Sequence, residues 1–457
     1  MITRLQAKNF KSWKDTGELT LAPLTGLFGT NSSGKTSILQ MLLLLKQTVE
    51  SPDRRQVLRL GDPTSIVDLG TFSDLVYRHD LSAILSLSLA WRLPQALVIN
   101  NPESEKEELF HINDLHFSNS ISEKSGRLAV ESFQYRFGSH DFGMQRKESR
   151  GDSDESRYEL THGDYPTKRS QGRPWPLPAP VKCYGFPDEA VGYYQNTGFL
   201  PDFVLAFEQV FSQMTYLGPL REYPQRSYVW AGEHPVDVGR RGDKAVAALL
   251  AAMSEKMKIP RLVKKRHRLE PIEARIAAWM KETDLIDSFE LRPIAEGRKD
   301  YEVRVRKNTS SSEVLITDVG FGVSQILPVL VLCYYAPEHS TILLEQPEIH
   351  LHPSVQASLA DVFIDVVKER HVQIILESHS EHLLRRLQRR IAEEQIGVDD
   401  TALYFCRMET DSSRIDRLDV DMFGNIRNWP KGFFGDEMGE LSAMTEAAMR
   451  RQMAEIE

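Results

Sequence analysis

The hydrophobic and polar positions of this chain follow two periodicities, and the changes between them predict its elements. A short apolar run at residues 24–28 predicts a buried strand, and a polar loop follows it. From Lys35 onward, apolar residues recur three and four positions apart, which is typical of an amphipathic helix. Over residues 314–404 buried strands again alternate with loops and helices, and the strands are predicted at Thr341–Glu345 and Val372–Leu376. This order predicts an α/β nucleotide-binding layer.

The middle of the chain has a different pattern. Alternating runs such as Leu81–Trp91 and Leu128–Phe137 predict β-strands, and helical patterns return at Phe203–Met214 and Pro271–Thr283. We therefore predict one α/β head that is interrupted by a β-rich lobe and a helical lobe. The predicted parts are residues 1–80 (N-terminal half of the head), 81–200 (β-rich insertion), 201–313 (helical and hairpin lobe), 314–430 (C-terminal half of the head) and 431–457 (C-terminal amphipathic helix).

Composition narrows the class of protein. The 457 residues carry a net charge of −9, so the whole chain is not a basic nucleic-acid binder and any DNA contact must come from a local patch. The three cysteines have no paired or CxxC spacing, which predicts reduced thiols and a cytoplasmic protein. The longest apolar run, Ile326–Tyr335, is interrupted by Pro328 and is too short to span a membrane, so we expect no membrane partner.

The loop after the first buried strand has the spacing of a phosphate-binding loop. Gly29 is followed by four residues and then by Gly34, Lys35 and Thr36, between a predicted strand and a predicted helix. The glycines allow backbone N–H groups to point inward, and the helix N-terminus adds a partial positive charge. Lys35 is expected to reach the β- and γ-phosphates of ATP, and the Thr36 hydroxyl is expected to bind Mg²⁺. The other predicted ATP-binding residues of this loop are Asn31, Ser32, Ser33 and Ser37.

Three further segments accompany this loop in a fixed order. A glycine–serine turn at residues 318–325 opens a helix, an apolar strand ends on Glu345, and a second apolar strand is followed by Glu377-Ser378-His379-Ser380. The glycine–serine turn alone is weak evidence. The order of phosphate loop, glycine–serine turn, acidic strand and strand followed by histidine is strong evidence of a nucleotide site.

These segments resemble the ABC-type ATPases of the RecF/SMC/OLD branch, over roughly residues 1–80 and 314–430. The resemblance implies an α/β, ABC-type P-loop ATPase head with a mixed sheet, whose protomers associate head-to-tail as a homodimer or a higher homo-oligomer. It implies that Glu345 holds Mg²⁺ with Thr36, and that His379 contacts the γ-phosphate. The turn that closes over the ATP of the partner protomer is then formed by Gly320, Gly322 and Ser324.

One position departs from the resembled families. They place a catalytic glutamate directly after the Mg²⁺-binding acid, whereas this chain has Gln346. An amide orients a water molecule but does not accept its proton as a carboxylate does. We therefore predict slow hydrolysis with ATP-dependent assembly, or a catalytic role for Glu348 two residues further along.

The C-terminal region resembles a group of bacterial ATPases within this branch. The segment Asp421–Phe434, with its Asn-Trp-Pro and Gly-Phe-Phe, carries this resemblance together with the phrase EQPEIHLHP. Members of that group occur in anti-phage defence modules beside a nuclease, as in Septu-like and PARIS-like pairs. The leading hypothesis is therefore an ATP-dependent sensor or scaffold that controls a separately encoded effector nuclease. A RecF-like DNA-binding ATPase of repair or recombination is the alternative, and a self-sufficient nuclease is disfavoured because no metal–carboxylate cluster is evident.

Several charged or amphipathic stretches have two interpretations each. The basic run Arg261–Arg268 is a candidate DNA contact or a solvated helix face. A second case is a group of four histidines that could be metal ligands: His350, His352, His379 and His382. Their positions in the segments that follow the two apolar strands account for them without a metal ion. The final predicted helix, residues 436–456, is either a packing element, which we favour, or an oligomerisation element.

Overall fold

A sheet of mainly parallel strands carries the phosphate-binding loop. The computed structural model describes residues 1–102, 104–147, 157–170, 172, 176–263, 266–430, 433 and 437–454. In this sheet the strands follow the order β10-β17-β18-β4-β19-β20, and the last pair is antiparallel. The strands are β10 (Met214–Leu217), β17 (Thr341–Glu345), β18 (Gln373–Glu377), β4 (Leu24–Gly29), β19 (Thr401–Glu409) and β20 (Ser412–Arg417). The predicted α/β fold with a mixed sheet is confirmed.

Helices cover both faces of this sheet. The helices of the chain are α1 (Lys35–Glu50), α2 (Phe72–Leu75), α3 (Asp188–Gly192), α4 (Leu200–Ser212), α5 (Ala245–Ser254), α6 (Ile272–Glu282), α7 (Phe321–Tyr335), α8 (Pro353–Arg370), α9 (Glu381–Ala392) and α10 (Glu437–Ala454), with short 3₁₀ turns η1 (Tyr77–His79) and η2 (Ile316–Asp318). Every residue of β4, β17 and β18 is buried, as expected for parallel strands between two helical layers.

The alternation of side chains along the strands decides which residues face the loop. Leu343 and Ile375 pack in one core with α1, whereas Leu344 and Leu376 pack in the other core with α7, α8 and α9. Successive side chains of a strand point to opposite faces. The last residues of β17 and β18 therefore point to the α1 side, where the phosphate loop lies.

An antiparallel sheet extends from the N-terminal strands. Its order is β2-β1-β5-β6-β7-β8-β9, with β3 beside β1. The strands are β1 (Ile2–Phe10), β2 (Trp13–Asp15), β3 (Leu19–Thr20), β5 (Leu85–Asn101), β6 (Ser104–Lys124), β7 (Arg127–Phe137), β8 (His140–Lys147) and β9 (Arg157–Thr161). The predicted insertion at residues 81–200 thus shares its sheet with the N-terminal segment, because β5 pairs with β1.

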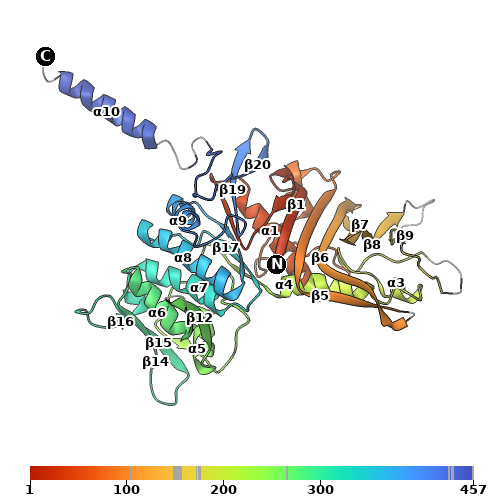
Figure 1. Cartoon of the computed structure of the whole chain (residues 1–457), viewed down its shortest axis with the longest axis horizontal. Helices are drawn as coiled ribbons and strands as arrows, with labels where there is room; N and C mark the ends of the chain where they lie inside the picture. The colour runs from red at the N-terminus through yellow and green to blue at the C-terminus, as the bar shows by residue number, and fades with distance from the viewer. Residues whose placement is uncertain are drawn as a thin grey trace.

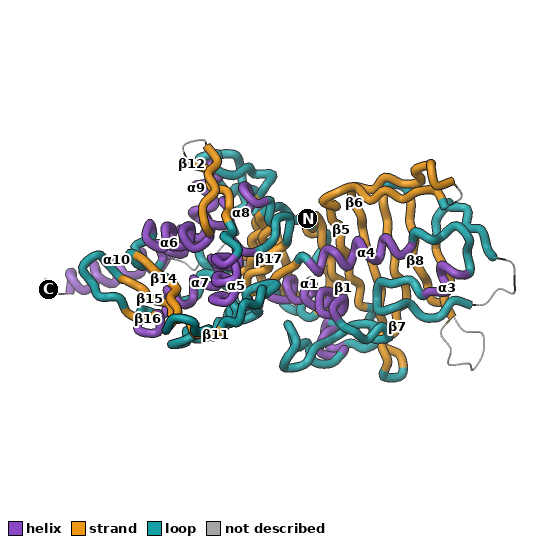
Figure 2. The backbone as a smooth tube through the Cα atoms, turned by 90° about the horizontal axis from the view of Figure 1, so that it is seen from below, coloured by secondary structure: helices purple, strands orange, loops and turns teal. Residues whose placement is uncertain are grey.

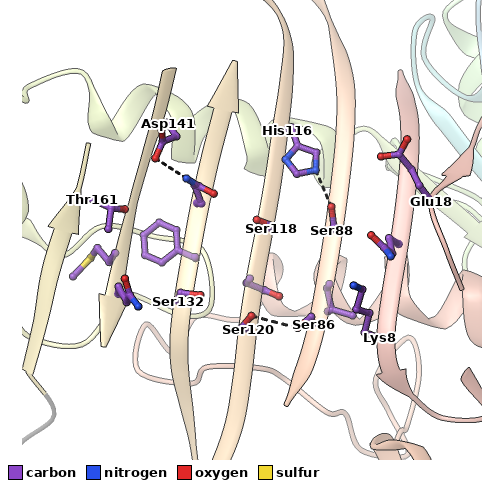
Figure 3. Close-up of a pocket in the computed structure, with 17 residues that line it drawn as sticks. Lys8, Glu18, Ser86, Ser88, His116, Ser118, Ser120, Ser132, Asp141 and Thr161 are labelled. Carbon is purple, nitrogen blue, oxygen red and sulfur yellow. Dashed lines mark hydrogen bonds between the residues drawn. The ribbon is translucent and has the colours of Figure 1, made fainter. Parts of the chain in front are cut away.

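The two faces of the antiparallel sheet differ in chemistry. Helix α4 crosses one face (Figure 2), where Phe207 packs on Phe117 and Trp91 with ring-centroid distances of 4.5 Å and 5.9 Å. The other face forms a shallow polar hollow that is rich in serine (Figure 3), and the Ser88 hydroxyl lies 2.8 Å from Nε2 of His116 there. Period-two alternation of apolar and polar residues produces this division.

The helical lobe contains two small sheets. One comprises β11 (Tyr228–Val229), β15 (Asp300–Arg306), β14 (Ser288–Pro293) and β16 (Val314–Leu315), and the other is the hairpin β12 (Lys258–Val263) and β13 (Arg266–Pro271). Arg261 and residues 266–268 of the basic run therefore belong to a hairpin, and the interpretation of these residues as a helix face is wrong. Arg261 pairs with Glu270 across the hairpin and with Glu282 of α6. Lys264 and Lys265 lie outside the described residues.

The parts follow one another along the molecule. Figure 1 shows the antiparallel sheet at one end, the parallel sheet in the middle, and the helical lobe with α5, α6 and β14–β16 beyond it. Helix α10 extends away from this body (Figure 1), and side chains 442–449 are exposed, including Met444 at 63%. The expectation that this helix packs on its own chain is wrong for residues 442–449, because the side chains of these residues are exposed. Within the described part of the chain, no helix is both long and apolar enough to cross a membrane.

Candidate nucleotide-binding site

The phosphate loop joins β4 to α1 and depends on two glycines. Gly29 has φ +140° and a Cβ there would meet the carbonyl oxygen of Cys406 at 2.0 Å, so β19 allows no side chain at this position. Gly34 has φ +87° and receives a hydrogen bond of 3.0 Å on its carbonyl from the Trp13 indole. Only glycine combines these dihedral angles with such close neighbours.

Lys35 lies inside the loop rather than in solvent. Its Nζ donates to the carbonyl oxygens of Gly29 at 3.2 Å and Thr30 at 2.7 Å, and lies 3.5 Å from the Ser33 hydroxyl. Burial lowers the pKa of the Lys35 ammonium. Ser33 and Ser37 are also buried, whereas Asn31 and Ser32 are exposed at the rim of the loop. The loop thus encloses its own lysine and keeps a polar rim for a ligand.

Glu345 ends β17, as predicted, and is held by a tyrosine from the neighbouring strand. The Tyr216 hydroxyl of β10 donates to its Oε1 at 3.0 Å. Burial raises the pKa of Glu345 to about 7, the charge of Glu377 contributes to this rise, and the Tyr216 hydrogen bond opposes it. The sequence places Tyr216 before a turn, but only the strand order shows that it reaches the acidic strand end.

Glu377 is the site residue that sequence reasoning did not assign. The Thr36 hydroxyl donates to its Oε2 at 2.7 Å, and Nζ of Lys35 lies 4.0 Å from its Oε1. Burial raises the pKa of Glu377, and the Thr36 and Lys35 contacts oppose that shift. Its signal in the sequence was the same as that of Glu345, since each carboxylate directly follows three apolar residues.

The turn after β17 is fixed by buried charges. The backbone N–H of Gln346 donates to the backbone carbonyl of Glu377 at 2.9 Å. The backbone carbonyl of Gln346 accepts a hydrogen bond of 3.1 Å from the Arg221 guanidinium. Glu348 accepts a bond of 2.7 Å from the backbone N–H of His379. Burial raises the pKa of Glu348 and lowers that of Arg221 to about 10. In this conformation Glu348 braces the turn that carries His379.

His379 lies beside the phosphate loop, and its predicted contact with the γ-phosphate stays a prediction. Burial lowers the pKa of its imidazole and the charge of Lys35 lowers it further, while a hydrogen bond to the Gly29 backbone raises it. The structure thus brings His379, Lys35, Thr36, Glu345 and Gln346 to the carboxyl end of one parallel sheet. That edge is where open α/β sheets bind ligands.

The glycine–serine turn lies against a different loop. Gly320 precedes the first residue of α7, and the Ser324 hydroxyl donates to the Phe321 carbonyl at 2.8 Å. The Phe321 ring lies 5.0 Å from the His350 imidazole, and a Cβ on Gly322 would contact the His350 carbonyl at 3.4 Å. The turn is therefore built on the loop that follows β17.

The oxygen atoms around Thr36 fit Mg²⁺. Magnesium prefers oxygen ligands and is commonly held by one or two carboxylates together with the phosphates of the nucleotide. Thr36, Glu377 and Glu345 would supply the hydroxyl and the carboxylates. Within the described residues no group of three or more His, Cys, Asp or Glu side chains is placed to hold a metal ion by itself. When bound, Mg²⁺ would neutralise phosphate charge and orient the γ-phosphate.

Two segments of the chain match models of ATPase domains. Residues 1–144 match the family model of an AAA ATPase domain, and residues 230–385 match the model of an AAA domain described as a putative AbiEii toxin of a type IV TA system. Residues 145–229 lie between these two matches. Residues 396–444 match a family described as proteins of unknown function (DUF3696). No curated protein matches the chain.

Solved SMC head domains are among the similar structures. One, an SMC head bound to the C-terminal winged-helix domain of ScpA, is 11% identical, with a TM-score of 0.45 over 92% of this chain and 98% of that one. The SMC head domain from Thermotoga maritima is 10% identical, with a TM-score of 0.39 over 92% and 99% of the two chains. An SMC head from Pyrococcus furiosus is 10% identical, with a TM-score of 0.41 over 91% and 96%.

Proposed function

We propose that this chain binds ATP with Mg²⁺ at the phosphate loop and hydrolyses it slowly. The observation that carries the proposal is the enclosed Lys35, whose ammonium lies among loop carbonyls while Thr36 faces the carboxyl ends of β17 and β18. Phosphate oxygens would replace the loop carbonyls as partners of Lys35, and the backbone N–H groups of the loop would hold the remaining charge.

Slow hydrolysis is supported by the residues that follow Glu345, where a base that activates the attacking water molecule would be expected. Gln346 offers no basic oxygen comparable to that of a carboxylate. Glu348 is buried and its Oε1 accepts the His379 N–H, so one of its two carboxylate oxygens is used in bracing the turn. Turnover at the rate of ordinary ABC ATPases that Glu348→Gln leaves unchanged would contradict this part of the proposal.

The nucleotide site is proposed to close against a second copy of the chain. The glycine–serine turn presents the Phe321 ring, which is 38% exposed, beside Tyr223, which is 71% exposed. Exposed aromatic rings next to a helix N-terminus suit a protein interface. We expect Phe321→Glu to reduce the ATP- and Mg²⁺-dependent dimer in light scattering, with Leu205→Glu on the exposed face of α4 as the matched control.

We propose that in the cell this chain is a sensor or scaffold of an anti-phage defence system. It would assemble when ATP binds and control a separately encoded effector nuclease. The match of residues 230–385 to a model described as a putative AbiEii toxin of a type IV TA system supports this role, as does the resemblance carried by the sequence of residues 421–434. The RecF-like alternative receives less support, because Arg261 of the basic hairpin is neutralised by two glutamates. Salt-dependent, ATP-dependent DNA binding by this chain alone would favour the alternative.

Titration with a fluorescent ATP analogue and excess Mg²⁺ tests the central proposal. Lys35→Ala removes the buried ammonium, and a charge-assisted phosphate contact is worth about 1.5–3 kcal/mol, so we expect at least about a tenfold loss of affinity. Lys14→Ala removes an exposed lysine of β2 and is expected to bind like the parent. The proposal is wrong if the parent binds no nucleotide, or if both variants bind equally well.

A further inference from the structure

Glu377 directly contacts Thr36, the residue that is expected to bind Mg²⁺ together with Glu345. We propose that Glu377 couples nucleotide binding to Mg²⁺: it holds the Thr36 hydroxyl when nucleotide is absent, and becomes a carboxylate ligand of Mg²⁺ when ATP is bound. The inference rests on the nucleotide-binding function proposed above and names a residue that regulates the same site.

The contact is direct, and it joins a half-buried threonine to a buried glutamate. The Thr36 hydroxyl donates to Glu377 at 2.7 Å, and the Lys35 ammonium lies 4.0 Å from the other carboxylate oxygen. Both Lys35 and Glu377 are only 3% exposed. The Glu377 carboxylate therefore contacts both Thr36, which is expected to bind Mg²⁺, and Lys35, which is expected to bind the γ-phosphate.

The order of strands explains why Glu377 reaches the loop. Strand β18 lies between β17 and β4, so Glu377 is one strand spacing, about 4.8 Å, closer to the loop strand than Glu345. The two glutamates are register partners in parallel strands, and they point to the same face. Glu345 is meanwhile engaged by the Tyr216 hydroxyl on its far side.

The charges at this edge disfavour nucleotide without metal. Two carboxylates face a region where the phosphates of ATP would add further negative charge, and the Lys35 ammonium lies near Glu377 as a partly compensating cation. Burial makes uncompensated like charges more costly. A divalent cation between phosphates and carboxylates removes the repulsion, so the arrangement selects ATP together with Mg²⁺ over free ATP.

The test is the ratio of the dissociation constants of a fluorescent ATP analogue measured in EDTA and in excess Mg²⁺, using the full chain. Glu377→Gln keeps a side chain that can accept from Thr36 but removes one negative charge and a good Mg²⁺ ligand. We expect the ratio to fall about tenfold or more, since nucleotide binds better in EDTA and gains less from Mg²⁺. The inference is overturned if Glu377→Gln keeps the ratio of the parent.

Two comparisons make the result specific. Glu381→Gln removes a carboxylate in the first turn of α9, where it pairs with Arg385, and is expected to keep the parental ratio. If Glu377→Gln does not fold, Glu377→Asp is used instead, because its shorter side chain moves the carboxylate away from Thr36. We expect this variant to need about three times as much Mg²⁺ for half-maximal binding of the ATP analogue. An unchanged Mg²⁺ requirement would contradict the inference. A parent that binds no nucleotide in either buffer would instead refute the proposed function.

Discussion

Gly34→Ala is the substitution whose cost the structure defines most completely. A side chain at φ +87° costs about 1–2 kcal/mol for an L-residue. The added Cβ would also lie 2.5 Å from the Ser413 hydroxyl, 2.8 Å from that of Ser12 and 2.8 Å from the Trp13 indole nitrogen. Those atoms form two hydrogen bonds, Ser413 to Ser12 and Trp13 to the Gly34 carbonyl, each worth about 1 kcal/mol. We therefore expect a total destabilisation of about 3–4 kcal/mol.

Urea denaturation of Gly34→Ala beside Gly126→Ala separates the two contributions. Gly126, between β6 and β7, has φ +76°, but a Cβ added there would meet no atom within 4 Å, so this variant should lose only the dihedral contribution of about 1–2 kcal/mol. We also expect Gly34→Ala to weaken nucleotide binding, because the loop must move to admit the methyl group. Equal losses of stability in the two variants would refute the argument from close contacts.

Three further predictions concern the acidic strand end, the turn behind it and the C-terminal helix. The pKa of Glu345 is raised to about 7, against 4.5 in the unfolded chain, so between these pH values the folded state holds a proton that the unfolded chain has lost. The free energy of unfolding, measured by urea denaturation in EDTA, should therefore fall by about 3 kcal/mol from pH 4.5 to pH 7. The Glu345→Gln variant should show a weaker fall. Arg221→Met removes the donor to the carbonyls of Gln325 and Gln346, so we expect a loss of about 1–3 kcal/mol by the same measurement, and no loss would contradict a bracing role. Truncation before α10 should leave the melting temperature within about 2 °C of the parent, because side chains 442–449 are exposed; a large drop would show that the helix packs on the body.

The elements that form the nucleotide site could be predicted because their signals are local. The phosphate loop is a continuous stretch of sequence, and β17 and β18 are short apolar runs that end in acids. The partnership of β5 with β1 could not be predicted in the same way, since antiparallel pairing joins segments about 80 residues apart. The basic hairpin was also missed, because a run of arginine and lysine shows neither the helical nor the strand periodicity clearly.

The role of Glu377 could not be predicted from the sequence either. Motif order along the chain points to Glu345 as the acid of the site, because it follows the phosphate loop and the glycine–serine turn in the expected sequence. Motif order carries no information about which strand lies beside the loop. The sheet places β18, not β17, next to β4, so the residue that meets Thr36 is decided by strand order. In this chain we therefore expect substitution of Glu377 to change the Mg²⁺ dependence of nucleotide binding more than substitution of Glu345, because Glu377 ends the strand next to β4 and contacts the Thr36 hydroxyl.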